Sequence, residues 1–305
     1  MLKLQDAVTI YLGVMLGALP FVLLGVIFSS FLAHFVSEDR LTSIIPKNRF
    51  LAPLSAMFIG FLFPVCECGN VPVARRLLRK GVPANVAITF LLAAPVINPV
   101  TFASTWAAFS FMPEIVWLRV IFTLVISYTI GIIFSFAGKN SDLVSENEMV
   151  CHNHSCEHLD HQDGYHVKFA RDKFWSFIKS LPEELFEMLA ALSMGAVLSA
   201  LFQTVLPRDL VGSLGQGPFM SIIAMIIFAV VISVCSSVDA FIALSYAGTF
   251  TNGAILAFLV FGPMIDLKAV WMLKTTFKWK VVMQISLLAL FMTILLTTIY
   301  NFYFI

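Results

Sequence analysis

Long apolar stretches separated by short polar ones dominate this chain of 305 residues. Several windows of 18 or more residues carry almost no charge, which is the pattern of membrane-spanning helices. The pattern predicts about eight spans in two sets of four. The first set covers residues 8–36, 51–80, 83–112 and 115–137, and the second covers residues 181–206, 218–247, 252–273 and 279–302.

Proline and polar residues interrupt four of these spans. The interruptions fall at Pro64–Pro72, Pro95–Pro99, Cys235–Asp239 and Gly262–Asp266. A helix needs about 20 residues to cross the hydrocarbon core, so a segment of about 30 residues is too long for one upright helix. Irregular backbone at membrane depth is tolerated where protein or a water-filled cavity satisfies its polar groups. We therefore predict half-helices that meet at the breaks.

The two sets repeat one pattern. Cys66 is matched by Cys235, 169 positions further on, and Asn98 is matched by Asp266, 168 positions further on. Such a pattern indicates a transporter built from two related halves, with its site at interrupted helices. Parallel and inverted repeats both stay open. We expect an all-α polytopic membrane protein with a first transmembrane repeat over residues 1–137, a polar Cys/His-rich cytoplasmic loop over 138–172 and a second repeat over 173–305.

Composition supports this prediction. The chain is 59% hydrophobic and only 12% charged, which is more apolar surface than a water-soluble domain of this size needs. The net charge of +1 gives no reason to expect a nucleic-acid partner. Neither a G-x-S-x-G nor an H-E-x-x-H motif occurs, so we do not expect an enzyme. The expected location is the cell membrane, with the lipid bilayer around a multi-pass protein.

The first break carries the peptide Cys66-Glu67-Cys68-Gly69-Asn70. Polar and ionisable groups at membrane depth are costly and tend to mark a pathway or a site. Two thiols one residue apart can both reach one soft ion, such as copper(I), zinc or trivalent arsenic, if the backbone bends. The alternative is that the cysteines are small buried hydrophobes, which leaves Glu67 and Asn70 unexplained. We expect Cys66, Glu67, Cys68 and Asn70 to contact a solute.

The second break supplies Cys235, Ser236 and Asp239, and therefore more oxygen than sulfur. Asn98 and Asp266 each follow a proline by three residues. A carboxylate at membrane depth indicates proton coupling or a cation site. Both residues are also good helix caps, with a lysine two residues after Asp266 as its ion-pair partner. Both the proton or cation role and the helix-cap role stay open. We expect Cys235, Ser236, Asp239, Asn98 and Asp266 to complete one asymmetric solute site near the midplane.

A polar insert reads CHNHSCEHLDHQDGYH and contains five of the six histidines. Its thiols and imidazoles are typical of a flexible soft-metal ligand set, although they fit no zinc-finger spacing. A polar linker that binds metal adventitiously is the alternative, and we expect no other cofactor. The candidate metal ligands are Cys151, His152, His154, Cys156, His158 and His161.

The stretch VCECGNVPVARRLLRKGVPANVAITFLLAAPVINPVTFAST resembles the signature of the ArsP-type predicted permeases. The resemblance extends over nearly the whole chain outside residues 138–172, and it is strongest to the YcgR-like bacterial branch. The arsenical branch of this family exports trivalent methylated arsenicals. By the matching motif, its solute-handling cysteine pair would be Cys66 and Cys68. Glu67 and the run RRLLRK fit the YcgR-like branch, so the resemblance implies a permease without naming its solute.

These features predict a permease that moves a small soft-metal, metalloid or thiol-reactive solute by alternating access between two repeats. Cys66 and Cys68 would contact the solute, Cys235 and Asp239 would face them, and Asp266 would carry a coupling proton. No G-x-x-x-x-G-K-[ST] motif occurs, so coupling would be to an ion gradient or to a separate partner. The alternatives are a transmembrane thiol/disulfide redox carrier and a non-transporting membrane subunit, each with a membrane or thiol protein as its partner.

Overall fold

A computed structural model describes residues 2–35, 45–46, 48–62, 67–136, 143–144, 181–182, 185–198, 200–201 and 217–304. Over these residues the chain is helical, with two isolated β-bridges and no strand. Five segments are long and apolar enough to cross a membrane: Ala7–Ile27, Ala84–Ala108, Pro113–Phe136, Asn252–Thr276 and Trp279–Tyr303. The prediction of an all-α polytopic membrane protein is confirmed.

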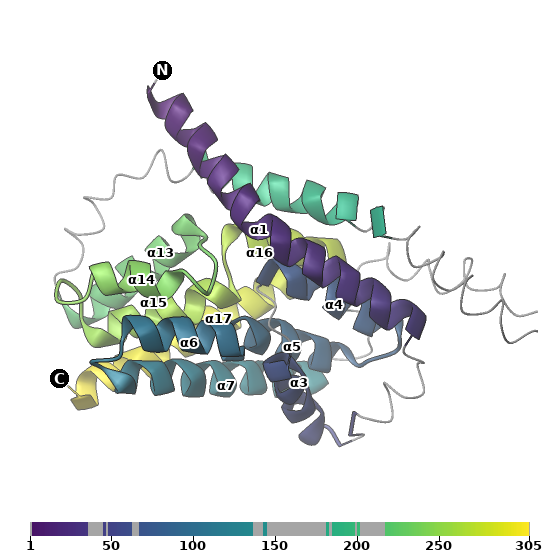
Figure 1. Cartoon of the computed structure of the whole chain (residues 1–305). Coiled ribbons are helices and arrows are strands. Elements are labelled where there is room, and N and C mark those ends of the chain that lie inside the picture. Colours follow the sequence, from purple (N-terminus) through teal and green to yellow (C-terminus); the bar gives the residue numbers. More distant parts are fainter. Residues whose placement is uncertain are drawn as a thin grey trace, which may run out of the picture.

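Three of the eight predicted spans contain shorter apolar helices, Leu51–Phe61, Leu185–Leu198 and Phe219–Ile232. The helices follow a similar order in the two halves (Figure 1). The first half has α1 (Leu2–Phe35), α3 (Leu51–Leu62), α4 (Glu67–Arg79), α5 (Ala84–Ile97), α6 (Pro99–Ala108) and α7 (Pro113–Phe136). After the helix Leu185–Leu198, the second half has α13 (Pro218–Ile232), α14 (Asp239–Ser245), α15 (Asn252–Met264), α16 (Leu267–Thr276) and α17 (Trp279–Phe304).

Helix boundaries fall at three of the predicted interruptions; in the fourth, Pro64–Pro72, α4 already begins at Glu67 and contains Pro72, so the described part of that predicted break is helical. Asn98 separates α5 from α6, and two residues that end in Asp266 separate α15 from α16. Pro95 and Pro263 lie in the last turns of α5 and α15. Because proline has no N–H to donate and its ring crowds the preceding turn, it weakens a helix at that point. A third break lies between α13 and α14, and residues 63–66, between α3 and α4, lie outside the described residues.

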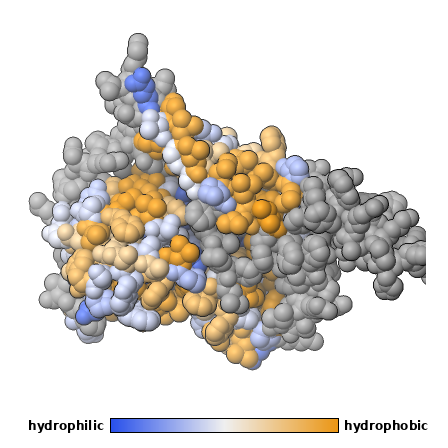
Figure 2. All heavy atoms as spheres, viewed as in Figure 1, coloured by the Kyte–Doolittle hydropathy of each residue, from blue (hydrophilic) through white to orange (hydrophobic). Residues whose placement is uncertain are grey.

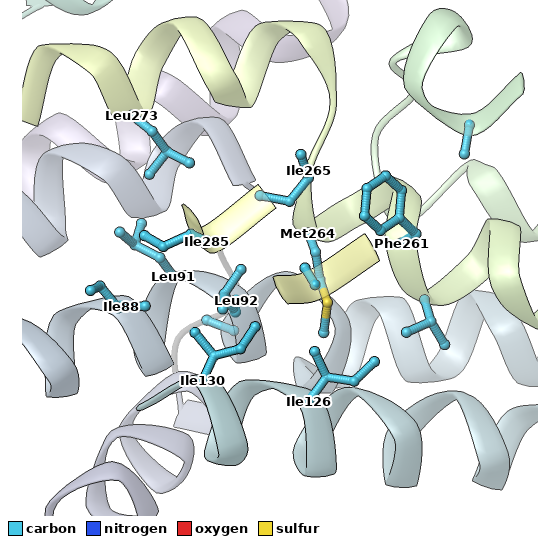
Figure 3. Packing of buried hydrophobic residues seen from close by; sticks show 14 of the residues in the cluster. Ile88, Leu91, Leu92, Ile126, Ile130, Phe261, Met264, Ile265, Leu273 and Ile285 are labelled. Carbon is cyan, nitrogen blue, oxygen red and sulfur yellow. The ribbon is translucent and has the colours of Figure 1, made fainter. Parts of the chain in front are cut away.

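The core lies where α5 and α15 meet α7, α16 and α17. Every residue of α5 is buried, and so are nearly all residues of α15. A helix that is apolar all round belongs at the centre of a bundle, which explains this placement. Figure 3 shows the contacts in this core. The labelled side chains are Ile88, Leu91, Leu92, Ile126, Ile130, Phe261, Met264, Ile265, Leu273 and Ile285.

The helix α1 crosses the bundle on one side and packs closely on α4 (Figure 1). A Cβ atom on Gly25 of α1 would clash with the carbonyl oxygen of Gly69 in α4. Small residues allow such close approach of helices in membranes. Hydrophobic residues are spread over the face that α1 crosses (Figure 2). Exposed side chains such as Leu16, Phe58 and Phe291 are of the kind that meets lipid.

Candidate functional site

A cavity of about 290 Å³ lies between α1 and the breaks of both halves. Cys68 at the start of α4 and Cys235 in the turn before α14 both line it. The structure therefore brings together one thiol from each half. Cys66, the other predicted thiol of the first break, lies outside the described residues. The remaining wall residues are Ile10, Gly13, Val14, Gly17, Ala18, Glu67, Ile232, Ser233, Val234, Val238 and Lys268.

Lys268 joins the halves at the cavity wall. Its Nζ donates to Oε1 of Glu67 at 3.0 Å and lies 3.3 Å from Oδ2 of Asp266. The three side chains are at most 4% exposed. Glu67 is the first residue of α4, and Asp266 is the N-cap of α16. Each carboxylate thus lies at a helix N-terminus, where the helix dipole stabilises negative charge.

Asn98 and Asp266 occupy equivalent cap positions. Oδ1 of Asn98 accepts a hydrogen bond from the Thr101 N–H at 2.8 Å, and Oδ1 of Asp266 accepts one from the Ala269 N–H at 2.6 Å. Asn98 and Asp266 are therefore both helix N-caps, as one of the two interpretations expected. Neither is among the described residues that line the 290 Å³ cavity. The coupling proton on Asp266 stays a prediction.

The buried guanidinium of Arg119, on α7, was missed in the sequence. Its Nη1 donates to Oγ1 of Thr105 at 2.7 Å, and its Nη2 donates to Oδ2 of Asp239 at 2.6 Å and to the Ser236 carbonyl at 3.4 Å. Thr101 Oγ1 also donates to Ser236 Oγ at 3.2 Å. Ser236 and Asp239 thus contact the first half and do not line the cavity. An arginine inside a predicted span is rare, and that rarity was the available signal.

Several buried polar atoms at these breaks have no hydrogen-bond partner among the described residues. They are Oε2 of Glu67, both side-chain polar atoms of Asn70 and Oδ1 of Asp239. Asn70 is 0% exposed. Buried polar groups are nearly always hydrogen-bonded, so these atoms are candidates to bind a solute, an ion or water. A second cavity of about 20 Å³ adjoins Glu67, and a space of this size accommodates one water.

The described residues contain no cluster of three or more His, Cys, Asp or Glu side chains that could hold a metal ion. Two thiols, those of Cys68 and Cys235, and the side chain of Glu67 line the cavity wall. The predicted ligands of the polar insert, Cys151, His152, His154, Cys156, His158 and His161, lie outside the described residues.

Comparison with known proteins identifies relatives over nearly the whole chain. Residues 3–302 match the family model ArsP_1, described as "Predicted permease". "UPF0718 protein YcgR" of Bacillus subtilis (strain 168) is 39% identical over 270 residues, 88% of either chain. A Streptococcus mutans serotype c (strain ATCC 700610 / UA159) protein is 35% identical over 279 residues, 92% of this chain and 89% of its own. Its name is "Putative two-component membrane permease complex subunit". No solved structure gives a significant match.

Proposed function

This chain belongs to the ArsP_1 family of predicted permeases, and we propose that it moves a small soft-metal, metalloid or thiol-reactive solute. The observation that carries this proposal is the cavity that Cys68 and Cys235 line from opposite halves. Thiolates are soft ligands and favour soft ions such as copper(I), zinc and trivalent arsenic. A cavity of about 290 Å³ also has room for more than a bare ion, because a water takes up only about 30 Å³ in the liquid.

The positions of the two thiols support alternating access. Cys68 is on a half-helix of the first half, and Cys235 is in a turn of the second half. If the halves move relative to each other, the spacing between the thiols changes, and a solute held by both loses one ligand. The contact between Lys268 and Glu67 crosses the same boundary, so this ion pair would have to adjust in the same movement. We propose that two related repeats provide this movement.

The name of the Streptococcus mutans relative supports a second proposal, that the chain works as one subunit of a two-component permease. A non-transporting subunit would need no thiol-lined cavity between its halves, and a cavity is present at Cys68 and Cys235. We therefore favour a subunit that itself contributes the pathway. Tagged chain purified from its native membrane should carry one partner membrane protein in a fixed ratio. Recovery of the chain alone under mild detergent would contradict this second proposal.

Binding to purified protein tests the solute class. Copper(I), zinc and trivalent arsenic are titrated against the full chain and against Cys68→Ser with Cys235→Ser. Because the cavity thiols are the proposed ligands, we expect the double variant to lose one binding event for at least one probe. The matched control is Cys151→Ser with Cys156→Ser, which removes the thiols of the polar insert and should keep the cavity event. Equal binding by the folded cavity variant and the unchanged protein would contradict the proposal.

A further inference from the structure

The turn that carries Cys235 has an unusual backbone. It follows α13 at Ser233, whose φ of 49° makes it the one non-glycine residue with positive φ in the described part of the chain. Such strained conformations persist where the surroundings hold them, and they cluster at functional sites. The residues of this turn that line the cavity are Ser233, Val234, Cys235 and Val238. Ser236 and Asp239 are not among the described residues that line it.

Contacts from the first half hold Ser236 and Asp239, the residues beside Cys235 that do not line the cavity. Arg119 binds the Asp239 carboxylate at 2.6 Å and the Ser236 carbonyl at 3.4 Å. The backbone N–H of Asp239 in turn donates to the carbonyl of Cys235 at 3.1 Å. A continuous chain of bonds thus runs from α7, through the first residue of α14, to the cysteine in the cavity wall.

We propose that Arg119 is the positioning residue for Cys235. By holding Asp239 and Ser236 from the first half, it sets where the Cys235 thiol lies relative to Cys68 across the cavity. The purpose of this placement, to hold a solute between the two thiols, rests on the proposed function. The Arg119–Asp239 pair is nearly inaccessible, at 1% and 3% exposure. Removing one partner leaves a buried unpaired charge, which is strongly unfavourable, so the turn should shift when the pair is lost.

Thiol labelling of the full chain in detergent tests this role without any transport assay. Maleimide labelling rates are measured separately at Cys235 and Cys68 by peptide mass spectrometry. In Arg119→Gln we expect labelling at Cys235 to accelerate about five-fold or more, the change that one lost buried hydrogen bond produces in an equilibrium. Labelling at Cys68 should stay within about two-fold, because a local shift does not open the whole structure. The exchange of charges, Arg119→Asp with Asp239→Arg, should move the Cys235 rate back toward that of the unchanged protein.

Two further variants keep the test decisive. Asp239→Asn removes the same pair from the other side and carries the same expectation if Arg119→Gln does not fold. Asn301→Leu removes a buried contact of the second half, in which Asn301 Oδ1 accepts from the Gly253 N–H at 3.0 Å, and it should leave the rate at Cys235 unchanged. An unchanged Cys235 rate in folded Arg119→Gln or Asp239→Asn would overturn the proposal, and so would an equal rise at both thiols. Because labelling needs no solute, failure of the proposed transport would not affect this result.

Discussion

Individual charges at the breaks are held by partners that lie far away in the sequence. Lys268 and Glu67 are 201 positions apart, and Arg119 and Asp239 are 120 positions apart. Both pairs connect the two halves and are nearly inaccessible. In a bundle with so few charges, buried ions need such partners. The ion pairs therefore help to define how the halves dock.

Replacing Lys268 by methionine leaves two buried carboxylates without their cation. We expect a loss of about 3–5 kcal/mol in the free energy of unfolding, the usual cost of breaking a buried ion pair from one side. Denaturant unfolding in detergent measures it. The control is Lys274→Met on the same helix, where the lysine is exposed beside Trp271; its loss should cost less than about 1 kcal/mol. Equal costs for the two variants would contradict the role given to Lys268.

Replacing Asp266 by asparagine separates its two interpretations. Asparagine keeps the N-cap that Asn98 already makes in the first half, but it removes the carboxylate beside Lys268. If Asp266 carries a coupling proton, solute flux in Asp266→Asn should no longer respond to an imposed pH gradient, while the protein stays folded. A flux that keeps its full response would leave Asp266 as a cap and an ion-pair partner only.

At this scale the sequence predicted part of the site. The thiols, the caps and the pairing of Lys268 with Asp266 could be inferred because residue type and local spacing carry that information. The partner of Arg119 could not be assigned, and neither could the contact between Glu67 and Lys268. Partners more than 100 positions apart are chosen by tertiary packing, which one sequence does not reveal.

Half-helices are the elements that build this site. Their breaks were predictable because proline and polar residues interrupt an apolar run. Their lengths were not: α14 has only 7 residues, and three predicted spans contain helices shorter than the membrane requires. Packing against neighbouring helices decides where each half-helix ends. The cap residues Asn98 and Asp266 then satisfy N–H groups at two of the new helix starts.

The crossing of α1 over α4 gives a prediction for packing between elements. A Cβ on Gly25 would meet backbone atoms of Gly69, which cannot move aside as a flexible side chain would. Gly25→Ala should therefore lower the free energy of unfolding by about 1–3 kcal/mol, the range typical of overpacking, and with it the melting temperature in detergent. Gly13→Ala is the matched control on the same helix, because nothing lies within 4 Å of its added Cβ. If both variants melt at the same temperature, the close crossing is wrong.

In the described part of the chain, the cavity of about 290 Å³ lies between two halves of similar helix order. Its walls are chemically unequal, with Cys68 and Glu67 from the first half and Cys235 and Lys268 from the second. The oxygen donors expected from the second break, Ser236 and Asp239, are not among the described residues that line the cavity. Membership in a family of predicted permeases gives this cavity a transport context.

Solute flux in reconstituted vesicles is the most direct test of this account. Uptake of copper(I), zinc and trivalent arsenic is measured for vesicles with the full chain, with Cys68→Ser plus Cys235→Ser, and without protein. We predict that at least one probe enters faster with the full chain, and that the double variant falls to the protein-free rate. Transport at the full rate by the folded double variant would contradict the claim that the solute passes between these two thiols.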